Sequence, residues 1–197
     1  MTESEKLLRL PHTGLRVPDR SLSLSNMRTH QGREGLAYTA TLRVDGKPVG
    51  QISDEADGRG CWLFPNDRSV YGQDHLDAYA ARCRTDAGRD VDAELLLAAL
   101  GDEHAWNRKL RMLPPGRMQM RRMEHIASDD DEPRGEPFSA GEGNSAMPRN
   151  DEQLAVLAQR LMAEAPPSRH GWWQGWRDGR WQDITERPDG VDPQLYG

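Results

Sequence analysis

The sequence has 197 residues, enough for one domain with a hydrophobic core and an appendage. Hydrophobic residues make up 36% of it and charged residues 29%, a polar composition which indicates that part of the chain lies outside the core. The net charge of −6 excludes the overall basic signature of proteins that bind duplex nucleic acid.

Cysteine usage and hydropathy indicate the compartment. Cys61 and Cys83 are too few for a disulfide framework and form no CxxC pair. The first residues, MTESEKLLRL, lack the apolar core of a signal peptide, and no apolar run reaches the ~18–20 residues of a membrane span. We therefore expect a cytoplasmic chain with reduced thiols and no membrane partner.

The first 65 residues begin with a polar stretch and continue as strands. Residues 1–20 are interrupted by Pro and Gly and are expected to form a flexible arm. Residues 36–44 alternate apolar and polar side chains, the period of a strand. Asp45-Gly46 then predicts a type I′ turn into a return strand, which places Leu42 opposite Val49. Further strands are expected around Leu22 and Leu24 and over 61–64.

Two helices are predicted to follow and to pack on this sheet. In the first, one apolar stripe has helical spacing: Leu76, Tyr79, Ala80 and Cys83. The first helix is expected to begin near Gln73 and to end at 85–88. The second is expected from about Asp90 to Arg111, with acidic residues in its first turn and basic residues in its last. Residues 21–127 would thus form one α+β domain with a small antiparallel sheet, although 117–127 fit either a strand or a short helix.

The last third of the chain is predicted to be a linker and a second folded segment. Residues 128–150 contain the acidic run 129–132 and many turn formers, so we expect a flexible acidic linker. Residues 151–165 have an apolar helical stripe preceded by Asn150, a favoured N-cap. The tail completes a C-terminal segment over 151–197, and its Asp-Gly turn predicts a hairpin with Trp176 opposite Trp181.

No catalytic motif stands out. The six histidines form no HxH, HExxH or HxxxH pair, and neither a GxSxG motif nor a phosphate-binding loop occurs. We expect no cofactor and no metal site. The carboxylates of Asp54, Glu55 and Asp57 are the exception, because such a cluster can bind a divalent cation, which leaves a metal-dependent enzyme as an alternative.

Two segments are rich in residues that form contact surfaces. Between 104 and 123 the basic residues are interleaved with Met and include Arg117, Arg121 and Arg122; phosphate contact, protein contact and a solvated strand with buried Met all fit. The tail combines the residue types that dominate binding hot spots: Trp172, Trp173, Trp176, Arg177, Arg180 and Trp181. These tryptophans would also fit base stacking, or a hairpin that completes a small core. The nine residues are the predicted partner-binding site.

The segment 25–60 contains SNMRT near its start, the strand LAYTATLRV with DGKPVGQIS after it, and the loop SDEADGRG. With these motifs it resembles a group of small uncharacterised proteins encoded by bacteriophages and plasmids. The resemblance implies a mobile-element origin. With the hot-spot residues, it favours a non-catalytic protein that binds a host protein or ribonucleoprotein complex, such as an anti-CRISPR or anti-restriction inhibitor. A nucleic-acid-binding accessory protein remains the alternative.

Overall fold

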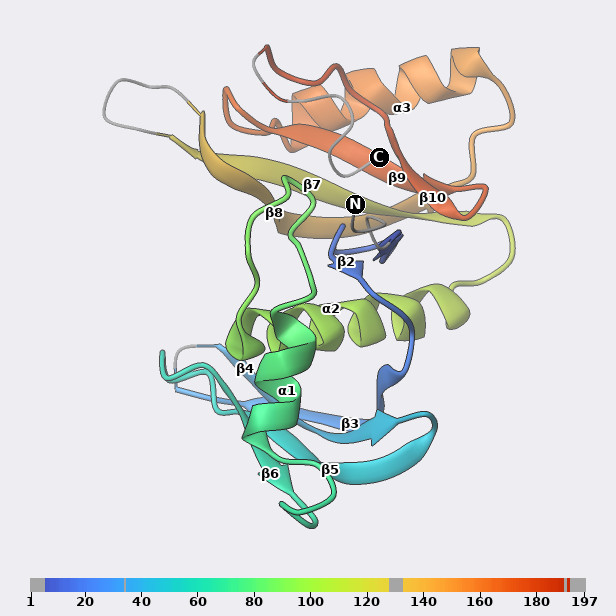
Figure 1. The fold of residues 1–197 in the computed structure, drawn as a ribbon. Coiled ribbons are helices and arrows are strands. Elements are labelled where there is room, and N and C mark those ends of the chain that lie inside the picture. The colour runs from blue at the N-terminus through green and yellow to red at the C-terminus, as the bar shows by residue number, and fades with distance from the viewer. Residues whose placement is uncertain (1–5, 34, 128–132, 190, 192–197) are drawn as a thin grey trace. The chain divides into compact units, whose positions relative to one another are not determined.

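A computed structural model describes residues 6–33, 35–127, 133–189 and 191. Within these residues, three helices and ten strands form three antiparallel sheets, which confirms the predicted α+β class (Figure 1). The chain divides into two compact units, residues 1–107 and 108–197, with the boundary inside helix α2. They are called the first unit and the second unit below. No helix in the described part of the chain combines the length and apolar character that a membrane crossing requires.

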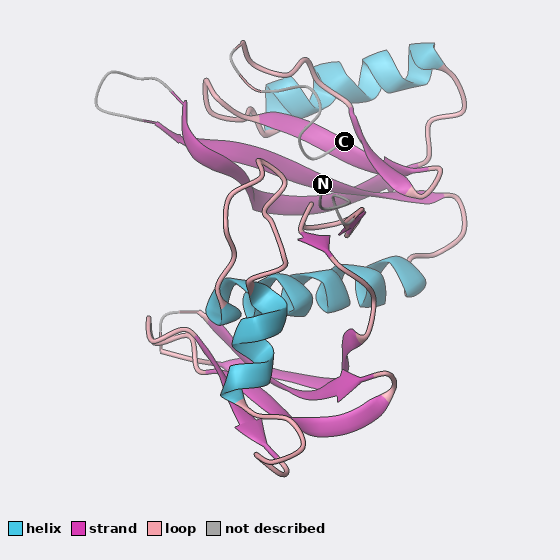
Figure 2. Ribbon diagram, viewed as in Figure 1, coloured by secondary structure: helices cyan, strands magenta, loops and turns pink. Residues whose placement is uncertain are grey.

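The main sheet of the first unit has the strand order β3-β4-β5-β6 (Figure 2). Its strands are β3 (Leu22–Gln31), β4 (Leu36–Val44), β5 (Lys47–Asp54) and β6 (Cys61–Pro65). The β4–β5 turn has φ angles of 50° at Asp45 and 76° at Gly46, the left-handed backbone that a type I′ turn requires. The predicted pairing of Leu42 with Val49 is wrong: a bulge after Leu42 shifts the register, and Leu42 lies opposite Gly50.

Helices α1 (Gln73–Ala80) and α2 (Ala93–Arg111) pack against one face of this sheet (Figure 1). Their apolar stripes meet side chains of β3, β4 and β5 in one buried cluster, which includes Leu24, Leu42, Ile52, Leu76, Leu96 and Leu97. Helix α1 is shorter than predicted, because the chain after Ala80 turns to form bridges from Arg84 to Arg16 and Asp90. Helix α2 starts three residues late, because the Asp92 carboxylate accepts a hydrogen bond from Leu95 N at 2.8 Å.

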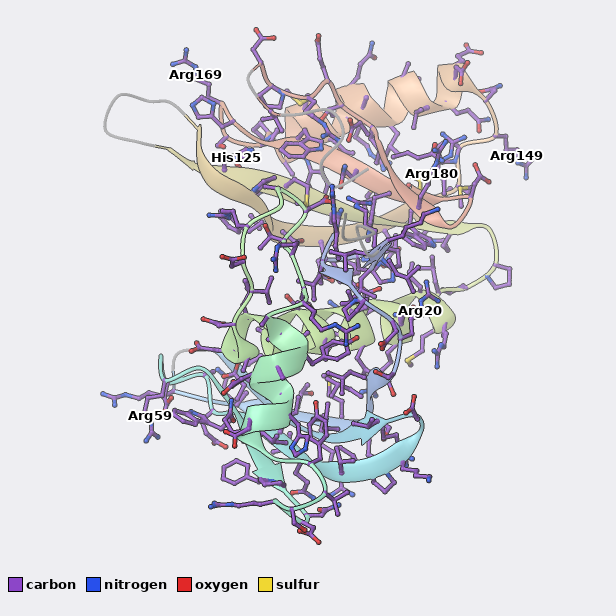
Figure 3. All side chains as sticks on the ribbon, viewed as in Figure 1. Arg20, Arg59, His125, Arg149, Arg169 and Arg180 are labelled. Carbon is purple, nitrogen blue, oxygen red and sulfur yellow. The ribbon has the colours of Figure 1, made fainter. Side chains whose placement is uncertain are left out.

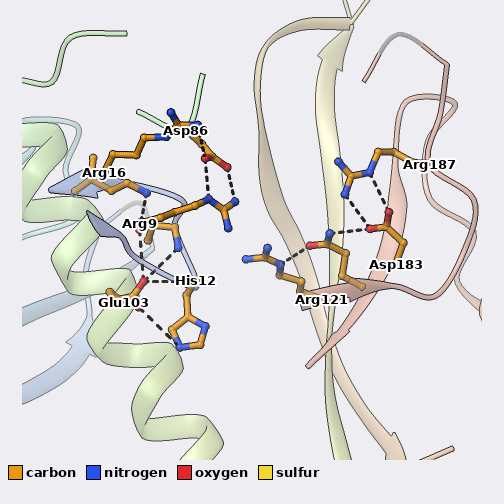
Figure 4. Close-up of polar contacts among 11 residues, drawn as sticks. Arg9, His12, Arg16, Asp86, Glu103, Arg121, Asp183 and Arg187 are labelled. Carbon is orange, nitrogen blue, oxygen red and sulfur yellow. Dashed lines mark hydrogen bonds and ion pairs between the residues drawn. The ribbon is translucent and has the colours of Figure 1, made fainter. Parts of the chain in front are cut away.

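The first 20 residues are not the flexible arm that the sequence predicts, at least over the described part from residue 6. Strand β1 (Leu8–Arg9) pairs with β2 (Arg16–Val17), and Leu10, Leu15 and Val17 are buried in the first unit's core. Two buried carboxylates from the helical region hold this segment (Figure 4). The sequence pattern gives no sign of these contacts because the partners are at least 70 residues apart in the sequence.

The first of these carboxylates, Asp86, is fully buried and binds two guanidinium groups. Arg9 Nε donates to Asp86 Oδ1 at 2.8 Å, and Arg9 Nη2 to Oδ2 at 2.5 Å, a bidentate pair. Arg16 Nη2 lies 3.6 Å from Oδ1. The second carboxylate, Glu103, accepts from the backbone N of His12 at 3.0 Å and of Thr13 at 3.2 Å. Together they fasten the two short strands to the body of the first unit.

The second unit is built on a sheet with the strand order β10-β9-β7-β8. Its strands are β7 (Arg117–Ala127), β8 (Pro133–Ala146), β9 (Trp172–Arg177) and β10 (Arg180–Asp183). Two predictions are corrected here. Residues 117–127 form a strand and belong to this unit rather than to a 21–127 domain, and 133–146 are strand β8 rather than part of a 128–150 linker.

The sequence does not predict strand β8, because the large apolar side chains of this strand pair belong to its partner β7. Gly143 and Ser145 lie opposite Met120 and Met118, so small residues face large ones across the pair. A strand of this kind has almost no apolar periodicity of its own. The acidic run 129–132 lies outside the described residues; within them, the Lys109 ammonium at the end of α2 contacts Glu142 of β8 at 2.5 Å.

Helix α3 (Asp151–Glu164) covers one face of the second sheet (Figure 1). Its start agrees with the sequence, because Asn150 Oδ1 accepts from Gln153 N at 2.9 Å. The predicted stripe packs as expected: Leu154, Leu157, Ala158 and Leu161 contact a cluster that includes Met118, Met120, Trp173 and Ile184. The C-terminal helix and the tail thus share one core.

Candidate binding surface

The tryptophans of the predicted site lie mainly inside the second unit. Trp176 and Trp181 are paired across the β9–β10 hairpin as predicted, with ring centroids 5.3 Å apart in an edge-to-face arrangement. Trp181 is nevertheless only 2% exposed, and the exposed fractions of Trp172 and Trp173 are 0% and 5%. Trp173 packs in the cluster under α3, Trp172 packs with Met123 and Val191, and Trp181 lies against the Arg121 guanidinium. The three are thus packed side chains, which is the alternative that the sequence left open.

Arg121 is buried as well, in a polar row that crosses three strands (Figure 4). Its Nε donates to Gln174 Oε1 at 2.9 Å, and its guanidinium carbon lies 4.2 Å from the centre of the Trp181 ring. Gln174 Nε2 in turn donates to Asp183 Oδ1 at 2.8 Å. The row ends at Arg187, whose Nε lies 3.0 Å from Asp183 Oδ2. Because each polar group has a partner, the row ties β7, β9 and β10 together.

The other predicted residues are more accessible but do not form one set with the buried ones. Arg117 and Arg180 are exposed, and Figure 3 shows Arg180 at the surface of the second unit. Arg117 donates to the Asn144 side chain. Trp176, Arg177 and Arg122 are half-buried, and Arg122 Nε lies 3.0 Å from the Glu124 carboxylate. The nine residues are thus divided between core and surface.

The acidic loop does not converge on a single point. Asp54 accepts from Ala56 N at 2.8 Å, while Glu55 accepts from Ser53 Oγ at 2.5 Å. Asp57 contacts Arg59, which lowers the pKa of this carboxyl through a hydrogen bond; Figure 3 shows Arg59 extending from this loop. Among the described residues, no group of three or more His, Cys, Asp or Glu is placed to hold a metal ion. The geometry gives no support to the metal-dependent alternative.

Neither thiol is activated. Burial raises the pKa of Cys61, whose Sγ accepts from the Tyr38 hydroxyl at 3.6 Å, and burial raises the pKa of Cys83 to about 11. Since the thiolate is the nucleophile, a raised pKa keeps both groups inert at neutral pH. Both cysteines are free and buried, as expected for core residues.

Two hollows flank helix α3 within the second unit. One of about 660 Å³ is lined by residues that include Met147, Val156 and Arg160, and one of about 1050 Å³ by others that include Met162 and Arg187. Val156 and Met162 are exposed at their rims. Among the described residues, neither lining contains a group of three or more His, Cys, Asp or Glu placed to hold a metal ion, so the hollows offer shape without an evident chemistry.

Among the described residues, the most exposed aromatic pair is in the first unit, on edge strand β6. Trp62 is 58% exposed and Phe64 is 60% exposed, whereas the alternate residues Cys61 and Leu63 point into the core cluster. Because successive strand residues alternate between faces, the two rings project from the same side of the sheet. This is the side opposite α1 and α2.

Strand register extends each ring into a row of polar side chains. The first row runs across the sheet from β6 to β3 as Trp62, Ser53, Thr39 and Arg28. The second row runs in the same way as Phe64, Gln51, Thr41 and Ser25. We call these eight residues the outer face. It holds two aromatic rings at one edge, hydroxyl and amide groups in the middle, and a guanidinium group at the other edge.

A bulge in β3 hollows this face next to Arg28. Register shifts between Ser25 and Arg28, and Asn26 takes a left-handed backbone with φ of 53°, which Asn tolerates better than most residues. The resulting hollow has a volume of about 400 Å³ and is lined by residues that include Asn26, Arg28, Thr39, Thr41 and Gln51. Bulges often redirect side chains beside functional sites.

Sequence reasoning missed the outer face although the signal was present. The short strand at 61–64 was predicted, and its period of two already separates Trp62 and Phe64 from Cys61 and Leu63. The sequence does not predict the pairing of β6 with β5, which places these rings beside the polar side of the β4–β5 hairpin. The surface rests on its geometry alone, since no protein-family model, no curated protein and no solved structure matches this chain.

Proposed function

We propose that this protein acts by non-catalytic binding and that the outer face is its contact surface. The observation that carries the proposal is the exposure of Trp62 and Phe64 side by side on an otherwise polar sheet face. Large aromatic side chains are the anchors of binding sites, and adjacent exposed rings mark contact surfaces more often than isolated ones do.

The rest of the described molecule supports binding over chemistry. The thiols have raised pKa values, and the carboxylates of the acidic loop are held by separate local partners. The outer face instead combines rings, hydrogen-bonding groups and positive charge, which suits recognition.

A host protein or ribonucleoprotein complex remains the proposed partner, and inhibition of a host defence system its most concrete form. The support is the resemblance of residues 25–60 to phage and plasmid proteins. This segment includes β4, β5 and most of β3, so it supplies six of the eight outer-face residues. The segment that carries the resemblance therefore builds the polar part of the surface, and Trp62 and Phe64 follow directly after it.

The test is capture from a host lysate with the full chain and with a variant that carries both Trp62→Ala and Phe64→Ala. Both side chains are exposed, so the variant is expected to fold, which circular dichroism checks. Phe138→Ala is the matched control, because this ring is also exposed but belongs to β8. We expect the double variant to lose the specifically captured material and the control to retain it. Equal capture by all three proteins would refute the outer face as the contact surface.

A further inference from the structure

We infer that the ligand of the outer face is single-stranded nucleic acid, with bases stacked on Trp62 and Phe64 and the phosphate backbone passing Arg28. The inference rests on the proposed function, because it assumes that the outer face is a contact surface. It adds the chemical class of the ligand. It also places the nucleic-acid site on the β3-β4-β5-β6 sheet, whereas the sequence predicted it in the basic stretch 104–123 and the tryptophan-rich tail.

The spacing of the two rings suits bases that are spread apart. Two residues along a strand are separated by roughly 7 Å, because each residue advances the chain by about 3.4 Å. Neighbouring bases in a duplex are stacked about 3.4 Å apart, so both rings cannot stack on consecutive bases of a duplex. A single strand can splay its bases onto aromatic side chains, and this stacking tolerates any sequence since every base has a π-face.

The middle of the outer face supplies groups for base edges or sugars. Thr39 and Thr41 have hydroxyls that both donate and accept, and Gln51 has an amide that does the same. The Ser53 hydroxyl donates to Glu55 and can still accept a hydrogen bond. These groups follow the rings within each row, one and two strand spacings away, or about 5 and 10 Å. A base stacked on either ring therefore has polar partners beside it.

The charge on the outer face is positive, which suits an anionic ligand. The eight outer-face residues include one arginine and no carboxylate, in a chain of net charge −6. Arg28 is exposed and has no hydrogen bond or ion pair within the described residues, so its guanidinium is available for a phosphate. It lies three strand spacings from Trp62, roughly 15 Å, a distance that several nucleotides of a single strand can cross.

The competing ligands use less of this surface. A protein segment added to the edge of β6 would bind through backbone groups, and it would leave Arg28 and the polar rows without a role. A duplex keeps its bases paired and stacked, so the two rings could reach base faces only by unstacking base steps, which costs free energy at each step. The pattern of two rings, one amide, hydroxyls and a guanidinium without a side-chain partner among the described residues fits the single strand best.

The experiment is a fluorescence-anisotropy titration of the full chain with labelled single-stranded DNA and RNA of about 12 nucleotides, within the ~4–16 that one small platform covers. The duplex of the same sequence is titrated in parallel. We expect saturable binding of a single strand, and little binding of the duplex. Trp62→Ala and Phe64→Ala should each weaken binding about 10-fold or more. Trp62→Phe should restore most of the affinity because it keeps a ring, while Phe138→Ala should have no effect.

The outcomes separate this inference from the proposed function. No binding of either single strand, equal binding of the duplex, or full affinity in the Trp62→Ala and Phe64→Ala variants would each overturn the nucleic-acid ligand. If lysate capture still depends on the two rings and resists nuclease, the contact surface stands and its ligand is a protein. If capture does not depend on them either, both proposals fall.

Discussion

Two sheets of this protein carry tryptophan, and they use it in opposite ways. In the second unit, Trp173 faces helix α3, while Trp172 and Trp181 lie on the other face of the sheet, yet all three are buried. In the first unit, helices cover only the inner face, and Trp62 and Phe64 remain exposed on the outer one. A local abundance of Trp and Arg therefore does not by itself indicate a contact surface. Coverage of each sheet face decides whether a ring packs or binds.

The largest expected effect comes from removing a buried ring. Trp172→Ala deletes a fully buried side chain and the hydrogen bond from its Nε1 to Asp183 at 3.0 Å. We expect a loss of about 3–5 kcal/mol in the free energy of unfolding, measured by urea denaturation. Trp62→Ala should change the same quantity by no more than about 0.5 kcal/mol, because this ring is exposed. Similar losses of unfolding free energy in the two variants would show that Trp62 also packs, and would contradict the difference between the two sheets.

The second effect concerns how the first unit holds its N-terminal strands. Asp86→Ala leaves Arg9 and Arg16 without their shared buried carboxylate. Because both guanidinium groups are partly exposed, we expect a loss of about 2–3 kcal/mol, less than for a fully buried pair. Limited proteolysis should then cut near residues 8–17 in the variant. Asp57→Ala in the exposed acidic loop is the control, and equal resistance of both variants to the protease would show that the carboxylate does not anchor these strands.

Much of the fold was predictable, since local signals and tertiary structure agree there. The Asn150 cap, the stripe of α3 and the Asp45-Gly46 turn all act within a few residues. The pairing of β8 with β7 and the contacts of Asp86 and Glu103 join distant segments, so no local pattern reports them. The predicted binding surface is wrong in its buried residues for a related reason. The tail is the richest cluster of Trp and Arg, but the exposure of each ring depends on which segments cover its sheet face, and no local pattern reports that.

The outer face itself should contribute to affinity and not to stability. Phe64→Ala is expected to lower the affinity for single-stranded oligonucleotide about 10-fold while the urea midpoint stays unchanged. Anisotropy and denaturation measured on the same preparation check this. Val156→Ala, at another exposed apolar position, should alter neither quantity. A parallel loss of stability in the Phe64 variant would mean that the ring packs rather than binds.

A further effect, confined to alkaline pH, is a pH dependence from the inner side of the first unit. Burial raises the pKa of Cys83 from 9.0 to about 11, so the folded state keeps its proton at pH values where the unfolded state loses it. The stabilisation is complete below pH 9 and declines as pH rises towards 11. We expect the urea midpoint of the wild type to fall more steeply over this interval than that of Cys83→Ala. Parallel curves would show that the buried thiol is not coupled to folding.

Hydroxyl-radical footprinting of the full chain, with and without saturating single-stranded oligonucleotide, tests most directly which sheet contacts the ligand. The method reports the solvent contact of individual side chains by mass spectrometry. The account predicts that oxidation of Trp62 and Phe64 falls when the oligonucleotide is present, while that of Phe138 and Trp176 does not change. Protection of Trp176 with unchanged oxidation of Trp62 and Phe64 would contradict it and return the binding site to the tail.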